Sequence, residues 1–376
     1  MKLLFLFNAK GNAQPGSTPD DWEPNNPCGQ QYMDSFYREG YFILLEKFAE
    51  SGLFDEITIV YESNVDPGYA SWIRPEFGFV RQIVMPEIRF AEKYIDEDTI
   101  IWARGGFRHW HDWLLKYKGK NWLILYAANT GRQRWTFWDV VLDDINMLFT
   151  IDSHNRIYYP FIKPIDDSFY FPVRTDYFWD ICIGASYIHD KKGQWRAIEL
   201  FDTYLRMYGG NLRGVMPGAM RRGVKTNAMI ETLQKGKYLI DTPGMLDKTK
   251  LMMVYNRSKV FVHMGSHGQN DRGPLEAAAC GCRVILGSPR YHSARLITHN
   301  IANFVMEVDN FEEWARVIRL YLCREEYPIK KVLRANEFKK VMGLDEARLR
   351  MTRLFLELQK QKPTIEGKKS AMLALA

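Results

Sequence analysis

The chain has 376 residues, a formal net charge of +6 at pH 7, and a composition of 46% hydrophobic and 26% charged residues. The length favours two domains over one, and the composition excludes intrinsic disorder as its general state. No run reaches the ~18 apolar residues of a membrane span, and the apolar run at residues 3–7 lacks a secretory cleavage site. Five scattered cysteines without zinc-ligand spacing predict a reducing, cytoplasmic compartment and no bound metal.

Strand-like apolar runs alternate with helical patterns along the first half, which is typical of a parallel sheet covered by helices. The predicted strands are residues 2–7, 56–61, 99–103 and 122–127, and the predicted helices are residues 30–50 and 109–118. This rhythm predicts an α/β fold with a first Rossmann-like domain over residues 1–163. Gly11, in the loop after the first strand, allows the backbone to approach a donor phosphate, or it merely permits a turn.

Two prolines between residues 162 and 172 interrupt both patterns, so the domain junction is predicted there. The alternation of strands and helices then begins again, with strands predicted at residues 179–183, 259–263 and 283–286 and helices at 194–207 and 274–280. A second Rossmann-like domain is predicted over residues 164–345. Residues 346–376 are predicted to form a C-terminal helix and, after Lys360, a frayed tail.

The segment 259–287 reads as strand, polar loop, short helix and strand. Gly273 and Pro274 are residues that favour a helix start, and the free N–H groups of a helix start can hold a diphosphate. Arg272 stands at the mouth of this helix. Glu276, in the first turn, is placed to accept hydrogen bonds from two vicinal ribose hydroxyls, or else to cap its own helix.

The run 272–285 (Arg-Gly-Pro-Leu-Glu-Ala-Ala-Ala-Cys-Gly-Cys-Arg-Val-Ile) resembles the donor-site signature of retaining GT-B glycosyltransferases of the family-four type. The resemblance extends over about residues 161–307. It implies two Rossmann-like domains facing each other across a cleft, and transfer from a UDP- or GDP-sugar to a hydroxyl acceptor without a metal. It implies donor binding by Arg272, Gly273, Leu275 and Glu276. A lysine-glycine turn similar to the family's adds Lys192, which is otherwise a solvated lysine.

Three departures separate this chain from that family. Gly268 stands where the family has a second glutamate, Ala185 and Ser186 stand where it has a phosphate-binding arginine, and its first-domain histidine is missing. Asn129 lies near the last of these positions. His109 and His111 follow another predicted strand and, with Asn129, are the candidate catalytic residues; the alternative is that both histidines are structural.

The acceptor stays open between a glycan, a lipid and DNA. The mild basicity is consistent with contact to an anionic surface or nucleic acid, or with a solvated face. Arg132, Arg134 and nearby tryptophans suit a DNA glycosyltransferase acting on a flipped hydroxymethylated base, although tryptophans also fill cores. Two further alternatives are a catalytically inactive GT-B protein that binds sugar or nucleic acid, and a sugar-nucleotide epimerase.

Overall fold

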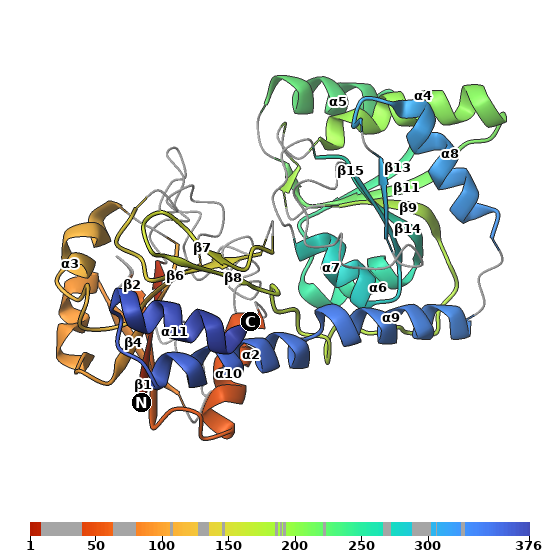
Figure 1. Cartoon of the computed structure of the whole chain (residues 1–376). Coiled ribbons are helices and arrows are strands. Elements are labelled where there is room, and N and C mark those ends of the chain that lie inside the picture. The colour runs from red at the N-terminus through yellow and green to blue at the C-terminus, as the bar shows by residue number, and fades with distance from the viewer. Residues whose placement is uncertain are drawn as a thin grey trace. The chain divides into compact units, whose positions relative to one another are not determined.

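The computed structural model describes residues 1–8, 40–62, 80–105, 108–126, 135–144, 147–184, 187–188, 190, 193–220, 223–265, 272–287, 302–305, 307–324 and 328–376. The chain divides into two compact units (Figure 1). The first contains β1 (Lys2–Asn8), Tyr41–Ile162 and Ala347–Ala376, and the second contains Lys163–Glu346.

The first unit is built on a sheet whose described strands run in the order β3-β2-β1-β4-β5-β6-β8-β7. All recorded pairings are parallel except that of β7 with β8. The strands after β1 are β2 (Glu56–Glu62), β3 (Arg81–Met85), β4 (Thr99–Arg104), β5 (Leu123–Tyr126), β6 (Val140–Asp143), β7 (Thr150–Ile151) and β8 (Ile157–Pro160). Because β2 and β4 flank β1, the strand order reverses between β1 and β4.

Apolar side chains on both faces explain why these segments form buried strands. Leu3 to Phe7 of β1 are each at most 1% exposed, as expected for a central parallel strand covered on both sides. The covering helices are α2 (Gly40–Glu50), η4 (Ile88–Tyr94), η5 (Arg108–Trp110), α3 (His111–Leu115), α10 (Leu344–Gln359, from Ala347 in this unit) and α11 (Ile365–Leu375). Phe355 of α10 packs edge-on against Phe54, with ring centroids 5.0 Å apart.

The predicted frayed tail after Lys360 is wrong, because these residues form α11 and join the first unit. The Thr364 side chain caps the helix by accepting a hydrogen bond from the Gly367 N–H at 3.1 Å. Lys368 is 5% exposed, and its Nζ lies 2.5 Å from Oδ1 of the buried Asp139. The polar composition of the tail does not reveal that one of its lysines pairs with a buried carboxylate.

The second unit has its own sheet, in the order β13-β11-β9-β14-β15-β16, and all its recorded pairings are parallel. Its strands are β9 (Trp179–Ile183), β11 (Arg213–Pro217), β13 (Leu239–Gly244), β14 (Ser258–His263), β15 (Arg283–Gly287) and β16 (Ala302–Val305). A separate short pair joins β10 (Tyr187–Ile188) to β12 (Ala219–Met220). The order reverses between β9 and β14.

Helices cover this second sheet as well (Figure 1). They are η8 (Gln194–Arg196), α4 (Ala197–Tyr208), α5 (Val224–Gln234), α6 (Lys248–Asn256), α7 (Arg272–Ala279), α8 (Phe311–Leu322) and α9 (Pro328–Met342). The buried Asn256 ties the proline-rich segment to α6, since its Nδ2 donates to the Phe171 carbonyl at 3.0 Å and its Oδ1 accepts from the Val173 N–H at 2.7 Å. No helix in the described ranges is long and apolar enough to cross a membrane.

Candidate functional site

The carboxyl ends of β9 and β14 mark the point where the second sheet reverses its strand order, the usual ligand position in open α/β sheets. Gly193 approaches this edge closely. Its φ is +77°, and a Cβ there would lie 2.1 Å from the carbonyl oxygen of Met264, just beyond β14. The Arg196 guanidinium donates to the same oxygen at 3.5 Å. The turn that contains Gly193 therefore lies against the end of β14; Lys192 itself is outside the described residues.

Glu276 is the fifth residue of α7, just beyond the first turn in which it was predicted, because the helix begins at Arg272. It meets two side chains from the neighbouring helix α6. The Lys248 ammonium lies 3.1 Å from Oε1 of Glu276, and the Tyr255 hydroxyl donates to Oε2 at 3.2 Å. Lys248 and Tyr255 are seven residues apart and so share one face of α6. All three are buried, with Glu276 only 3% exposed.

The charge state of Glu276 depends on two opposing effects on its pKa, those of burial and of the neighbouring side chains. Burial raises the pKa of the Glu276 carboxyl, but the charges of Lys248 and Arg272 and the hydrogen bonds from Lys248 and Tyr255 outweigh burial and hold that pKa below its usual value. Tyr170 is also close, with its ring centroid 6.4 Å from that of Tyr255, and burial and then the charge of Glu276 raise the pKa of its phenol. Glu276 is therefore an ionised, buried hydrogen-bond acceptor near the start of α7.

Three other predicted donor-binding residues occupy the same helix start. Arg272 is partly exposed and opens α7, and its charge acts on Glu276. Gly273 leaves little room for a side chain, since a Cβ there would lie 3.2 Å from the Phe261 ring. Leu275 is 1% exposed, so its side chain belongs to the core, and it can offer a ligand only its backbone. The structure brings these residues and Glu276 together in one turn and a half of helix.

A second buried carboxylate, Glu62, ends β2 of the first unit. Its Oε2 lies 2.5 Å from Nε2 of His109 and accepts a hydrogen bond from the Trp110 indole N–H at 2.7 Å, while its Oε1 accepts from the Ile88 N–H at 3.0 Å. Burial raises the pKa of the Glu62 carboxyl, but these hydrogen bonds outweigh it and hold the pKa below the usual value. An ionised Glu62 requires a proton on Nε2 of His109, so a neutral ring carries its lone pair on Nδ1.

The two predicted histidines therefore have different surroundings. The His109 side chain is 50% exposed and is oriented by the buried Glu62, at the same edge of the sheet where β4 ends. His111 has its Nδ1 2.9 Å from the fully exposed carboxylate of Asp112, and its ring lies edge-on to Trp135 and Phe137. Only His109 combines solvent access with a buried carboxylate that fixes its ring.

Several other predictions fall on the core or outside the described residues. Trp110, Trp113 and Trp138 are 0–5% exposed and pack in the core of the first unit, so their rings are not open platforms for a base or sugar. Gly11, Lys192, Asn129, Arg132, Arg134, Ala185, Ser186 and Gly268 lie outside the described residues.

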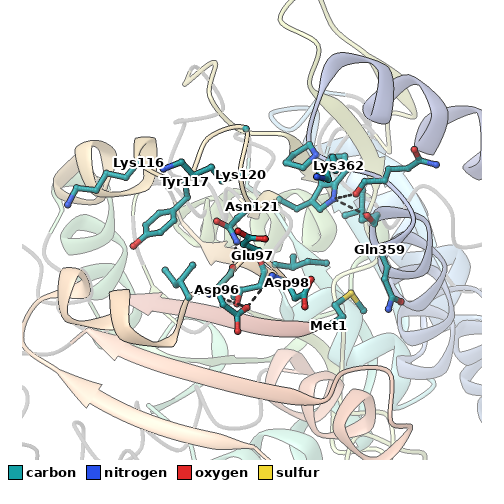
Figure 2. A pocket seen from close by; sticks show the side chains of 18 of the residues that line it. Met1, Asp96, Glu97, Asp98, Lys116, Tyr117, Lys120, Asn121, Gln359 and Lys362 are labelled. Carbon is teal, nitrogen blue, oxygen red and sulfur yellow. Dashed lines mark hydrogen bonds between the residues drawn. The ribbon is translucent and has the colours of Figure 1, made fainter.

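A cavity of about 1130 Å³ lies elsewhere in the first unit, at the amino ends of the strands. Figure 2 shows its polar lining, which includes Asp96, Glu97 and Asp98 before β4, Asn121 before β5 and Lys362 after α10. None of the described candidate residues lines this cavity, so its size does not point to the predicted chemistry. No group of three or more His, Cys, Asp or Glu side chains in the described ranges is placed to hold a metal ion.

Sequence reasoning missed Glu62, Lys248 and Tyr255. A glutamate directly after the apolar run at residues 57–61 is a weak signal, because acidic residues often end strands on the surface. Nothing in the local sequence distinguishes the buried Lys248 from the neighbouring Lys250, whose side chain is 70% exposed.

Comparison with solved structures identifies the fold that these units form. Sucrose-phosphate synthase from Thermosynechococcus elongatus matches with a TM-score of 0.62 and 14% identity over 95% of this chain and 98% of that one. A glycosyltransferase from Rickettsia africae matches with a TM-score of 0.59 and 12% identity over 95% of this chain and 99% of that one. Anabaena HepE in complex with UDP matches with a TM-score of 0.63 and 11% identity over 95% of this chain and 100% of that one. No protein-family model and no curated protein sequence matches the chain. The chain has the α/β GT-B fold, as its sequence predicted.

Proposed function

We propose that this protein transfers a glycosyl group from a nucleotide sugar to a hydroxyl acceptor, and that the donor binds on the second unit. The observation that carries the proposal is the ionised, buried Glu276 near the start of α7, downstream of the strand at the order reversal of the sheet. An ionised carboxylate pairs well with the two hydroxyls of a ribose, because hydrogen bonds to charged groups are about twice as strong as neutral ones.

The rest of the donor would lie along the start of α7. The free N–H groups and the positive dipole end of the helix favour a diphosphate, and Arg272 adds a positive charge there. Stabilising the departing diphosphate is the main catalytic effect that we assign to these residues. Structural neighbours support the donor class, since HepE is crystallised with UDP-glucose as well as with UDP.

On the first unit we assign His109 to the binding of a hydroxyl group of the acceptor or of the transferred sugar. Its ring is fixed by Glu62 and is half exposed, whereas His111 depends on a surface carboxylate. Three of the four tryptophans near these residues are buried and Trp135 is partly buried, which reduces the aromatic surface open to a flipped base, so we favour a glycan or lipid acceptor. Retention of the anomeric configuration follows only from the resemblance in residues 272–285.

The first test is a thermal-shift titration with UDP, GDP, ADP and their sugars. A nucleotide that binds only the native state stabilises it by about 2.7 kcal/mol at one hundred times its Kd. We expect one nucleotide to raise the melting temperature of the unsubstituted protein and of the exposed-site control Glu231→Ala, but not that of Glu276→Ala. If no nucleotide stabilises the unsubstituted protein, the donor-site proposal is wrong.

Activity provides the second test. We expect release of free nucleotide from the stabilising nucleotide sugar, with water as acceptor, by the unsubstituted protein and by His111→Ala. His109→Ala removes one hydrogen bond to a hydroxyl group and should lower this rate by about 2-fold to 10-fold. The nucleotide-induced thermal shift should stay unchanged, because His109 belongs to the first unit and the nucleotide is proposed to bind the second. Binding without any transfer or hydrolysis would instead support an inactive sugar-binding protein.

A further inference from the structure

Two side chains of α6 surround the carboxylate at the start of α7. Lys248 contacts one oxygen of Glu276 and Tyr255 contacts the other, at 3.1 Å and 3.2 Å. The Lys248 ammonium also lies 5.7 Å from the centroid of the Tyr170 ring, within the range of a cation–π contact. A buried lysine is rare in proteins unless a partner offsets the cost of removing its charge from water.

This arrangement fixes the carboxylate in both position and charge. Each carboxylate oxygen can accept two hydrogen bonds, and Lys248 and Tyr255 use one on each oxygen. Both oxygens thus retain acceptor capacity, which is what a pair of vicinal hydroxyls requires. The contacts from opposite oxygens also prevent the carboxylate from rotating about its last bond.

On this basis, which rests on the proposed donor site, we propose that Lys248 is a positioning residue for nucleotide recognition: it keeps Glu276 ionised and oriented to read the 2′- and 3′-hydroxyls of the donor ribose. Tyr255 supports the same orientation. The groups that face Glu276 are Lys248 and Tyr255 from α6, Arg272 from α7, Cys280 directly after α7, and Tyr170 from the segment before β9. Of these, only Lys248 places a cation in contact with the carboxylate through a recorded hydrogen bond.

The test compares the affinities of UDP and 2′-deoxy-UDP, and of GDP and 2′-deoxy-GDP, between pH 6 and pH 8.5. One lost hydrogen bond to a charged group corresponds to a preference of about 10-fold to 100-fold for the ribose form. The unsubstituted protein should show this preference at every pH. The control Lys250→Met, at an exposed position of the same helix, should behave identically.

Lys248→Met should lose the preference at pH 6 and regain part of it at pH 8.5. Without the ammonium, burial is opposed by the Arg272 charge and the Tyr255 hydrogen bond alone, so the pKa of the Glu276 carboxyl rises. A larger fraction of the carboxyl is then protonated at low pH, and the affinity for the ribose form increases with pH. Lys248→Arg should restore a preference that does not depend on pH. A lysine with a purely structural role would alter the melting temperature without altering this ratio.

A folded Lys248→Met that keeps the unsubstituted ratio at pH 6 would overturn the inference while leaving the donor site intact. If Lys248→Met does not fold, Tyr255→Phe decides the question, because it removes one donor and keeps the ion pair. Its preference should fall about 2-fold to 10-fold, and an unchanged preference would overturn the inference. If neither UDP nor GDP binds the unsubstituted protein, the proposed function and this inference fail together.

Discussion

Each unit of this protein carries a buried carboxylate near the carboxyl end of its parallel sheet, but the two carboxylates have different partners. Glu62 in the first unit accepts hydrogen bonds from the Ile88 N–H, the Trp110 indole and the half-exposed His109. Glu276 in the second unit contacts the buried ammonium of Lys248. Both carboxyls have a pKa below the usual value despite burial.

The comparison shows that a low pKa does not by itself reveal what a buried carboxylate does. Glu62 accepts hydrogen bonds from two buried N–H groups and from the half-exposed ring of His109, so its removal leaves donors unpaired but no buried cation. Glu276 is half of a buried ion pair, and removal of either half leaves the other charge without the partner that it contacts. We therefore expect the two sites to respond differently to the same substitutions.

The largest expected effect is at the ion pair of the second unit. Glu276→Gln and Lys248→Met should each lower the free energy of unfolding by about 3–5 kcal/mol, because each leaves one buried charge unpaired. The double substitution should cost less than the sum of the two. Urea unfolding of the four proteins measures this coupling, and additive losses would show that the pair does not act as a unit.

Asp139 tests whether the stability cost of a substitution depends on the unit that holds the carboxylate or on the side chain that pairs with it. It lies in the first unit, as Glu62 does, but its partner is the buried Lys368. Lys368→Met should cost about 3 kcal/mol, close to the value for Lys248→Met. The adjacent Lys369→Met, at an exposed position, should change stability by less than about 0.5 kcal/mol. If Lys368→Met and Lys369→Met change the urea-unfolding free energy equally, Lys368 is not the stabilising partner of Asp139.

A smaller loss is expected at Glu62. Glu62→Gln keeps one carbonyl acceptor but no longer satisfies donors on both oxygens, which should lower the free energy of unfolding by about 1–3 kcal/mol. The same variant should lower glycosyl release as His109→Ala does, because the ring of His109 loses its orientation. Nucleotide-induced thermal shifts should remain, and their loss would mean that the two carboxylates serve a single site.

The smallest effect concerns acid stability. Because the folded-state pKa of Glu62 lies below its ordinary value of 4.5, the stability that its ionised form contributes is complete above about pH 4.5 and is lost as the pH falls through the lower folded pKa. Unfolding free energies measured between pH 3 and pH 6 should therefore decline less steeply in Glu62→Gln than in the unsubstituted protein. If the unfolding free energies of the two proteins fall equally steeply with decreasing pH, the folded-state pKa of Glu62 is not lowered.

Much of the fold could be predicted from apolar runs alone. The strand predicted at residues 179–183 has the same bounds as β9, and the strands predicted at residues 56–61, 99–103 and 283–286 each end one residue short of the observed strand. Strands β11 and β13 were missed because their sequences, Arg-Gly-Val-Met-Pro and Leu-Ile-Asp-Thr-Pro-Gly, contain the residues that usually mark turns. Backbone pairing with neighbouring strands outweighs that local preference.

In the candidate site, too, features set by neighbouring residues were predictable and contacts between distant segments were not. The short helix with Arg272, Gly273 and Glu276 was predictable, because a glycine, a proline and an apolar run are signals read within a few residues. The contacts of Glu276 with Lys248 and Tyr255 were not, since they join segments about twenty to thirty residues apart through the packing of two helices.

The sequence by itself determined that this chain alternates strands and helices twice, and that a short helix with a glycine near its start follows a strand of the second half. Local propensity and hydrophobic period are properties of neighbouring residues, so they can be read without a structure. The tertiary structure alone decided which partner each buried carboxylate has: Lys248 for Glu276, His109 for Glu62, and Lys368 of the tail for Asp139. Burial and pairing depend on which elements pack against each other, and no local pattern records that.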